Sequence, residues 1–378
     1  MRALVLNTQM EPGGAQRMAD VIFDHLRDRG HEAEWWSLYL KRPAFEDRPG
    51  AYCLSETPPQ SALDYAKILA KFAFRLYQFR PTVIFAFTHY ANTLGLAAGR
   101  LVGVPVRIAH QGNPRETYPL LARKADSLLG TLGVYTANIM CSRAVLQSFS
   151  QNSQRYLSDT QVILNGSRQN HQVPTSAQRY AAKRTFGLEH DEKLVVAVGR
   201  LSAQKRHHIL IDAMNHLPMT RLLIAGDGED RAELEARIVA SRLQSRVRLL
   251  GNIPPNQVAE LLTAADVFAM ASEFEGLSLA LVEAMAAGLP IVGSDIPQIS
   301  DVVVDDAGRS AGTLIASTNP KEWADAILEV TATDGIGEEY GRRARQRARA
   351  FDIDQSALEY ISIAESQYRV MESQFQVG

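Results

Sequence analysis

The sequence predicts an α/β protein built from two doubly wound domains, each with a parallel sheet. The 378 residues are too many for one ordinary core. Short aliphatic or β-branched runs alternate with longer amphipathic stretches, which is typical of parallel strands joined by covering helices. The alternation restarts near residue 190, after a polar segment at residues 167–180 that we interpret as an inter-domain linker.

The expected elements follow from these runs in chain order. Strands are expected at residues 3–6, 82–87, 106–109, 137–141 and 161–164 in a first domain, 1–168, and at residues 194–198, 221–225, 247–250, 267–270 and 291–293 in a second domain, 169–354. Helices are expected at residues 15–30, 61–79, 207–217, 229–242 and 257–264. Ligands of such sheets bind at the carboxyl ends of the strands, so a cleft between the domains would collect the loops of both.

The composition narrows the function classes. Hydrophobic residues make up 46% of the chain and charged residues 22%, as in ordinary soluble globular proteins. The net charge of −2 gives no electrostatic reason to expect a nucleic-acid partner. The two cysteines, Cys53 and Cys141, lie far apart, which favours a reducing compartment over a disulfide scaffold.

The hydropathy of the sequence indicates neither a signal peptide nor a membrane-spanning helix. The first apolar run, at residues 3–6, is too short for the core of a signal peptide. No run reaches about 18 apolar residues, the length of a spanning helix. We therefore expect a cytoplasmic protein whose membrane contact, if any, is peripheral.

Two loops have the chemistry of phosphate sites. Gly13 and Gly14 lie where the first helix begins, and a helix start offers free amides to an anion, although a plain turn would also explain them. Arg200 and Lys205 follow the strand at 194–198. Two permanent cations there suit a diphosphate, and a solvated basic loop is the alternative. We interpret His207 and His208, which come next, as helix-start or surface residues.

A pair of glutamates marks the loop and helix after the strand at 267–270. Ser278 is the expected N-cap of a helix at residues 279–287, so Glu275 lies in the loop and Glu283 in the helix. The amides of residues 276–278 could face an anion, and Glu283 could accept hydrogen bonds from ribose hydroxyls. The alternative for Glu283 is an exposed stripe of the helix.

At these residues the chain resembles the retaining glycosyltransferases of family 4, which have the GT-B fold of two Rossmann-like domains facing a central cleft. The matching segments are GGAQR, GRLSAQK, LLIAGDGED, VRLLGNIP and EFEGLSLALVEAMAAGLP, which contains the E-x7-E pair. They occur in the family's order, and the C-terminal half matches more closely. The resemblance also implies that a helix at about 355–378 packs back on the first domain.

The resemblance implies a role for each matching residue. Arg200 and Lys205 would bind the donor diphosphate, Glu275 the transferred sugar and Glu283 the ribose. The remaining donor contacts would be Gly276, Leu277 and Ser278 at the helix start, Asn252 and Ile253 beside the base, and Gly13 and Gly14 from the other domain.

Three positions depart from the family pattern. The family often has a histidine at the end of the fourth strand of the N-terminal domain, and His110 is the candidate here. A different alignment of this strand with the family pattern puts Gly112 at that position, and His89 is a second candidate. Arg206 stands where a small or polar residue is usual, and Gln298 where glycine is common.

The implied reaction moves a sugar, most simply from a UDP-sugar, to an acceptor hydroxyl in bacterial polysaccharide, lipopolysaccharide or glycolipid synthesis. A guanosine donor is the alternative. The leaving phosphate would help to take the acceptor proton, so the implied protein task is to neutralise charge, without a metal or other cofactor. The acidic run at 227–230 is better explained as a tight turn than as a metal site.

Other functions and partners stay open. A sugar-nucleotide epimerase, a phosphorylase or a catalytically silent nucleotide-sugar binder could use the same architecture. The acceptor would be a sugar or a lipid-linked glycan. The helix at 61–79 carries three basic and several aromatic residues, which fits either a core helix with a solvated basic face or a helix lying on an anionic membrane.

Overall fold

The computed structural model describes residues 1–11, 13–42, 45, 48–168, 173–189, 191–333 and 335–376, without the side chains of residues 374–376. The chain forms two compact units. Met1–Gly166 and Ile353–Gly378 make the N-terminal unit, and Ser167–Asp352 make the C-terminal unit. The sequence-based boundaries were 168 and 354, within two residues of these divisions.

The N-terminal unit is built on a seven-stranded parallel sheet of order β3-β2-β1-β4-β5-β6-β7. Its strands are β1 (Arg2–Met10), β2 (Glu32–Leu40), β3 (Ala51–Cys53), β4 (Val83–Phe87), β5 (Val106–Gln111), β6 (Ala137–Met140) and β7 (Thr160–Val162). Its helices are α1 (Gly14–Asp28), α2 (Ala62–Phe79), α3 (Leu96–Leu101), α4 (Leu120–Thr131), α5 (Arg143–Ser148), α6 (Gln154–Ser158) and α15 (Ile353–Gln376), with a π-helical turn at Ala91–Gly95 before α3 and a 3-10 turn at Arg115–Thr117.

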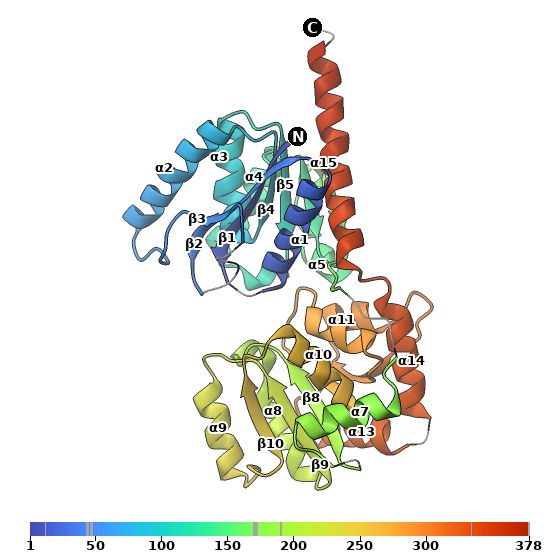
Figure 1. The fold of residues 1–378 in the computed structure, drawn as a ribbon. Coiled ribbons are helices and arrows are strands. Elements are labelled where there is room, and N and C mark those ends of the chain that lie inside the picture. Colours follow the sequence, from blue (N-terminus) through green and yellow to red (C-terminus); the bar gives the residue numbers. More distant parts are fainter. Residues whose placement is uncertain are drawn as a thin grey trace. The chain divides into compact units, whose positions relative to one another are not determined.

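Helices cover both faces of this sheet. Adjacent residues of β2 show the division, because successive side chains of a strand point to opposite faces. Trp35 packs near Phe23 of α1, with ring centroids 6.3 Å apart, whereas Trp36 meets Phe72 of α2 at 6.0 Å. One face is therefore covered by α1 and α15 and the other by α2, α3 and α4, as Figure 1 shows.

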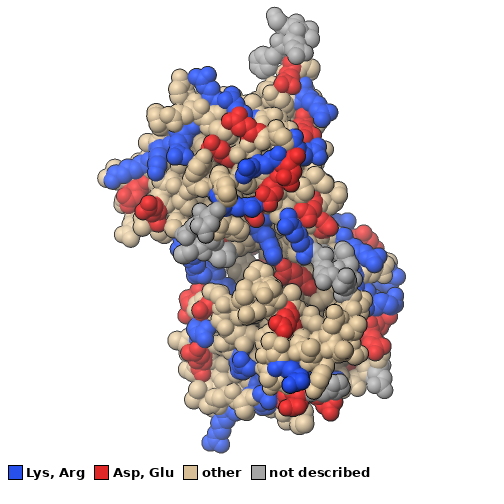
Figure 2. Space-filling view, in the orientation of Figure 1, with Lys and Arg blue, Asp and Glu red and all other residues tan. Residues whose placement is uncertain are grey.

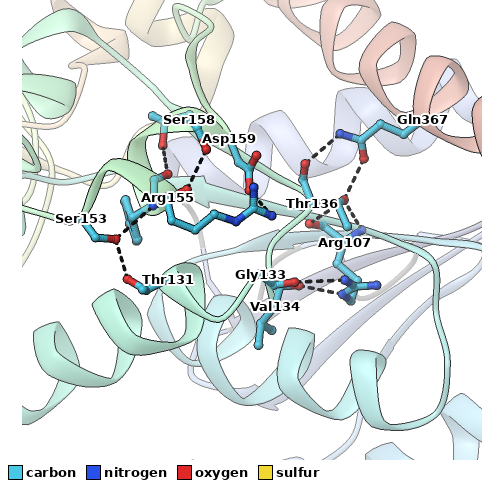
Figure 3. A network of polar contacts seen from close by, with 12 residues as sticks. Arg107, Thr131, Gly133, Val134, Thr136, Ser153, Arg155, Ser158, Asp159 and Gln367 are labelled. Atoms are coloured by element: carbon cyan, nitrogen blue, oxygen red, sulfur yellow. Dashed lines mark hydrogen bonds and ion pairs between the residues drawn. The ribbon is translucent and has the colours of Figure 1, made fainter.

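The C-terminal helix α15 completes the core of the N-terminal unit. Ala357, Tyr360, Ile361 and Ala364 are fully buried in the cluster that contains α1 and strands β1, β4, β5 and β6. Farther along, the Gln367 side chain donates to the Thr136 carbonyl at 2.9 Å and accepts from the Thr136 hydroxyl at 2.7 Å (Figure 3). The expected helix at 355–378 thus begins at Ile353 and is part of the first unit.

The C-terminal unit has a six-stranded parallel sheet of order β10-β9-β8-β11-β12-β13. Its strands are β8 (Lys193–Val198), β9 (Thr220–Ala225), β10 (Val247–Gly251), β11 (Val267–Met270), β12 (Ile291–Ser294) and β13 (Gly312–Ile315). Its helices are α7 (Ser176–Thr185), α8 (His207–Ala213), α9 (Arg231–Ala240), α10 (Pro255–Ala264), α11 (Leu279–Ala286), α12 (Pro297–Val303), α13 (Pro320–Ala332) and α14 (Ile336–Ala348), with 3-10 turns at Ala203–Lys205 and Met214–His216.

The predicted strands and helices are confirmed, but some strands of the structure were not predicted. All ten predicted strands overlap observed ones, while β2, β3 and β13 were missed. The linker interpretation of residues 167–180 was wrong in its second half, where α7 begins at Ser176. Thr175 and Gln178 form a capping box there, and Lys183 Nζ reaches Asp266 at 3.0 Å. Among the described residues, no helix is long and apolar enough to span a membrane.

Candidate functional site

The candidate site of the C-terminal unit lies at the carboxyl end of β8, where three loops are joined by backbone hydrogen bonds. The Gly199 amide donates to the Ala225 carbonyl at 2.9 Å, and the Leu201 amide donates to the Asp227 carbonyl at 3.1 Å. The Gly226 amide donates to the Gly251 carbonyl at 2.8 Å. The ends of β8, β9 and β10 therefore form one rigid edge.

Two glycines allow the loops after β8 and β9 to approach this closely. Gly226 has a φ of +136°, and a Cβ built there would lie 1.9 Å from the Gly199 carbonyl oxygen. A Cβ on Gly228 would lie 2.2 Å from the Leu201 carbonyl oxygen. The segment at 227–230 forms a turn in which the Gly228 amide donates to Asp227 Oδ1 at 2.8 Å. No group of three or more His, Cys, Asp or Glu that could hold a metal occurs in the described parts of the chain.

Lys205 and Glu275 form the central contact of the site. The Lys205 Nζ lies 2.6 Å from Glu275 Oε1, and the two side chains are 15% and 8% exposed. Lys205 runs over Gly199, since a Cβ there would lie 3.1 Å from the Lys205 Cε. An ion pair this enclosed at the carboxyl end of a sheet is a candidate for a functional site.

The backbone around this pair is tied together by two neighbours of Lys205. The Gln204 side chain donates to the Phe274 carbonyl at 2.8 Å, and the Glu273 amide donates to the Gln204 carbonyl at 2.8 Å. Arg206 donates to the carbonyls of Ala271 and Ser272, both at 3.0 Å. The unusual Arg206 therefore has a structural role, because it holds the loop that carries Glu275 against the loop that carries Lys205.

His207 follows directly and begins α8, as predicted, but it is not a surface residue. It is 5% exposed, and burial, with the nearby charge of Lys205, lowers its pKa to about 4. A positive charge on His207 would face Lys205 without solvent. His207 is therefore neutral near pH 7, and the cationic charge at this edge comes from Lys205 and Arg200.

The second glutamate lies on α11. Ser278 caps this helix, as predicted, by accepting from the Leu281 amide at 3.4 Å. Glu283 is half-buried and shares the outward stripe of α11 with Leu279, Ala280 and Ala287, while the other residues of the helix are buried. The amides of Gly276, Leu277 and Ser278 lie between Glu275 and the first turn of α11, where a helix attracts anions.

The remaining predicted donor residues lie along the same edge. Arg200 is exposed immediately after Gly199, at the end of β8. Asn252 is exposed and Ile253 half-buried after β10, which is separated from β8 by β9. Two strand spacings place them about 10 Å from the end of β8. Gln298, on α12, is buried.

In the N-terminal unit, Gly13 is the N-cap of α1 and Gly14 is its first residue. The φ of Gly13 is −177°, an extended conformation that any residue adopts, and a Cβ there would meet only the movable end of Gln16 at 2.6 Å. Gly13 and Gly14 thus lie at the carboxyl end of β1, where the sequence placed them.

His110 does not present its ring at this edge. It is 1% exposed, with Nδ1 2.6 Å from the Tyr360 hydroxyl of α15 and its ring against Phe87. Burial lowers its pKa to about 3. The Nδ1 side of the ring thus belongs to the core shared with α15. Nε2 has no hydrogen-bond partner among the described residues and lies beside Gly112, whose Cβ position is 3.1 Å away, so the catalytic role of His110 stays a prediction.

His89 occupies a different position. It follows β4, is half-buried, and stacks on Tyr118 with ring centroids 5.2 Å apart. The preceding Thr88 has a φ of +72°, an uncommon backbone for a β-branched residue. Its hydroxyl accepts from the Thr8 amide at 3.2 Å, which fixes the loop to β1. Both histidines lie near the carboxyl edge of the sheet, but His110 is inside the end of β5 with its ring buried, whereas His89 is in the loop beyond β4 with part of its surface exposed.

Comparison with known proteins shows what the C-terminal unit is similar to. Residues 178–350 match the model of the family described as glycosyl transferases group 1. The C-terminal unit matches the group 1 glycosyltransferases. A curated relative, D-inositol 3-phosphate glycosyltransferase of Xylanimonas cellulosilytica, is 31% identical over 197 residues, covering 50% of this chain and 46% of that protein. The chain thus spans about half the length of the curated relatives it matches.

Solved structures resemble the whole chain. Anabaena HepE, in complex with UDP and glucose, is 23% identical with a TM-score of 0.83 and covers 97% of this chain and 100% of its own. WaaG, a glycosyltransferase involved in lipopolysaccharide biosynthesis, is 17% identical with a TM-score of 0.75, covering 96% of this chain and 99% of its own. The fold is GT-B, as the sequence predicted.

The C-terminal unit contains features that the sequence did not reveal. The spacing identified Lys205 and Glu275 as separate contributors, but their 2.6 Å contact joins loops 70 residues apart. The carbonyl contacts of Arg206 were also missed, since an arginine beside a lysine is most simply a solvated charge. The paired glycines of LLIAGDGED were the available signal for the close approach to Gly199.

Proposed function

We propose that this chain transfers a sugar from a nucleotide-diphosphate sugar to an acceptor hydroxyl with retention of configuration. The observation that carries the proposal is the enclosed Lys205–Glu275 pair at the end of β8, next to the capped start of α11. The match of residues 178–350 to group 1 glycosyltransferases supports the same reaction class. The assignment of each residue's role below is part of the proposal.

The proposed donor lies along the carboxyl edge of the C-terminal sheet. Lys205, Arg200 and the amides of residues 276–278 would meet the diphosphate, whose negative charge grows as the sugar leaves. Donors fixed in place before the reaction stabilise that charge without rearranging, which is the main electrostatic source of catalysis. On this proposal a metal is not needed for the same task.

Glu275 would have two tasks. In the structure it holds the Lys205 ammonium at 2.6 Å, which restricts the lysine to one position. In the complex its second oxygen would accept from hydroxyls of the transferred sugar. Glu283 would accept from the ribose hydroxyls, and Asn252 and Ile253 would border the base about 10 Å along the edge.

In the proposed reaction the glycosidic carbon–oxygen bond to the phosphate breaks as the acceptor oxygen bonds to the same carbon from the same face. The acceptor proton passes to the departing phosphate oxygen. The N-terminal unit would bind the acceptor, with Gly13, Gly14 and His89 at the carboxyl edge of its sheet. We propose His89 rather than His110 because His110 is enclosed by α15.

A UDP-sugar is the proposed donor. HepE, which has the same fold, has been solved with UDP-glucose, and this supports a uridine nucleotide. The proposed acceptor is a sugar or lipid-linked glycan in surface-polysaccharide or glycolipid assembly, in line with the description of WaaG.

Donor binding and turnover test the proposal separately. The native protein should be stabilised against heat by UDP and by one UDP-sugar above all others, since a ligand stabilises the state that binds it. Lys205→Met and Glu275→Gln should each reduce turnover by at least about a hundredfold, the usual effect of losing one transition-state donor. Glu273→Gln is the matched control, because Glu273 is exposed and two residues from Glu275.

Three results would contradict the proposal. Normal turnover in Lys205→Met would remove the lysine from the leaving-group site. Loss of turnover on chelation, restored by a divalent cation, would overturn the metal-independent mechanism. Interconversion of donor sugars without an acceptor would identify an epimerase.

A further inference from the structure

The N-terminal unit has one face whose helices expose large apolar side chains. On α2 these are Leu63, Phe74 and Tyr77, at 64%, 62% and 63% exposure. At the end of α3 and on α4 they are Leu101, Val102, Leu120, Leu121, Leu128 and Leu132, at 44–87% exposure. On α1 and α15, which cover the opposite face, only Val370 is of this kind among the described residues. We call the α2–α3–α4 side the open face.

Helices α2 and α4 of the open face bury few of their residues against the sheet. Of the 18 residues of α2, the buried ones are Ile68, Phe72 and Leu76. Of the 12 residues of α4, the buried ones are Asp126 and Gly130. A helix normally buries its apolar stripe, so two helices on the same face of a sheet that turn leucines and aromatics outward indicate a surface that a partner covers.

The charge of the open face is strongly one-sided. Its basic residues are Lys67, Lys71 and Arg75 on α2, Arg100 on α3, and Arg123 and Lys124 on α4. The acidic residues of the same helices are Asp64, which caps α2 with Ser61, and Asp126, which is buried and accepts from Gln111 and Tyr135. Basic side chains follow α2 in Figure 2, at the left of the N-terminal unit.

These cations also lack carboxylate partners. Within the described parts of the chain, none of the six basic residues of the open face forms an ion pair. On the opposite face, Arg29 pairs with Glu365 at 3.2 Å and Arg48 with Asp20 at 2.7 Å. Lys71 and Arg100 donate to the carbonyls of Leu54 and Gly133, at 2.7 and 2.8 Å, but no carboxylate of the described residues neutralises them. The positive charge of the open face can therefore attract an anionic partner.

A cationic hollow adjoins the exposed stripe of α2. A cavity of about 440 Å³ lies between α2 and the loop at residues 54–60, and its basic lining residues are Lys67 and Lys71. Its one acidic lining residue, Asp64, already accepts from the amides of Gln60 and Ser61. A hollow of this kind beside exposed aromatics suits a phosphate head group whose chain lies against the apolar stripe.

We infer that the open face binds the surface of an anionic phospholipid bilayer. Apolar and aromatic side chains that enter the head-group region, flanked by Lys and Arg that reach lipid phosphates, are the features of interfacial helices. A protein partner would more often bury a compact core depleted of lysine. The inference does not depend on the proposed reaction, since α2 and α4 supply none of the proposed catalytic groups.

Flotation of the purified full chain with vesicles tests this inference. It should float with vesicles of phosphatidylcholine and phosphatidylglycerol and should not float with phosphatidylcholine alone. Phe74→Ser with Tyr77→Ser should weaken binding by at least about tenfold. Lys67→Gln with Lys124→Gln should weaken it about fivefold for each charge, and salt should have less effect on this variant than on the native chain.

The matched control is Met219→Ser with Val239→Ser. These residues are 83% and 58% exposed but lie in the C-terminal unit, so this variant should float like the native chain. Circular dichroism and UDP-induced thermal stabilisation of each variant check that it is folded. A loss of flotation without a loss of UDP binding separates this inference from the proposed function.

Three outcomes would overturn the inference. One is the absence of flotation with anionic vesicles, and another is equal flotation of the native chain and the open-face variants. The third is a dimer in solution that Phe74→Ser with Tyr77→Ser dissociates, without vesicle binding, which would make the open face an interface between two copies of this chain.

Discussion

Replacement of Gly226 by alanine is the sharpest test of how the carboxyl edge of the C-terminal sheet is built. The new Cβ would lie 1.9 Å from the Gly199 carbonyl oxygen, whereas ordinary contacts are 3.4–4 Å. Gly199 must then move, which breaks the hydrogen bonds from Gly199 to Ala225 and from Gly226 to Gly251. The two backbone hydrogen bonds are worth about 1 kcal/mol each, and an alanine at φ +136° adds about 1–3 kcal/mol of strain. The free energy of unfolding should therefore fall by about 3–5 kcal/mol.

Gly308→Ala provides the matched control. Gly308 is in the same unit and has a φ of +76°, but no atom lies within 4 Å of its Cβ position. The free energy of unfolding of Gly308→Ala should fall by only about 1 kcal/mol, the cost of placing alanine in a left-handed conformation. Urea unfolding measures both variants, and UDP binding should weaken only in Gly226→Ala because Gly199 positions Lys205. Equal losses of stability with intact UDP binding would refute the close-approach argument.

Two further predictions concern the buried histidines. His207 and His110 have pKa values lowered to about 4 and about 3, below the ordinary 6.5, so they stay neutral in the folded protein while the unfolded chain takes up protons. Their contribution to stability is therefore complete above pH 6.5 and is lost as the pH falls toward 4. At pH 5 each neutral histidine should lower the free energy of unfolding, measured with urea, by about 2 kcal/mol relative to pH 7. Equal stability at pH 7 and pH 5 would contradict this. Tyr360→Phe should cost about 1–3 kcal/mol, because His110 Nδ1 loses its 2.6 Å partner, whereas Tyr77→Phe at an exposed site should cost almost nothing. Thermal unfolding compares the two, and a neutral Tyr360→Phe would show that the hydrogen bond is dispensable.

The sequence predicts the strands that alternate with clear amphipathic helices. It does not predict a strand whose side chains are buried on both faces of the sheet. β2, which reads EAEWWSLYL, has Trp35 and Trp36 buried on opposite faces, so neither strand nor helix periodicity stands out. The polar start of α7 looked like a linker because its stability comes partly from Lys183 reaching Asp266, 83 residues away.

The candidate site shows the same limit. Local pattern placed Lys205, Glu275 and the Ser278 cap at strand and helix ends, where position follows from neighbouring residues. It could not reveal that His110 is enclosed, because the residue that encloses it, Tyr360, lies 250 positions later in the chain. Long-range packing decides which of the two histidine rings is buried, and single-sequence periodicity contains no information about that packing.

The placement of α15 has a consequence for biosynthesis. Ala357, Tyr360, Ile361 and Ala364 close a core whose other walls are made near the start of the chain. During translation the first strands and helices therefore emerge with an uncovered apolar side, and they keep it while the entire C-terminal unit is synthesised. Since domains fold as units as they emerge, the C-terminal unit can reach its native state first, although it is made second. Until residues 353–364 are added, the early segment therefore exposes apolar surface that the finished protein buries.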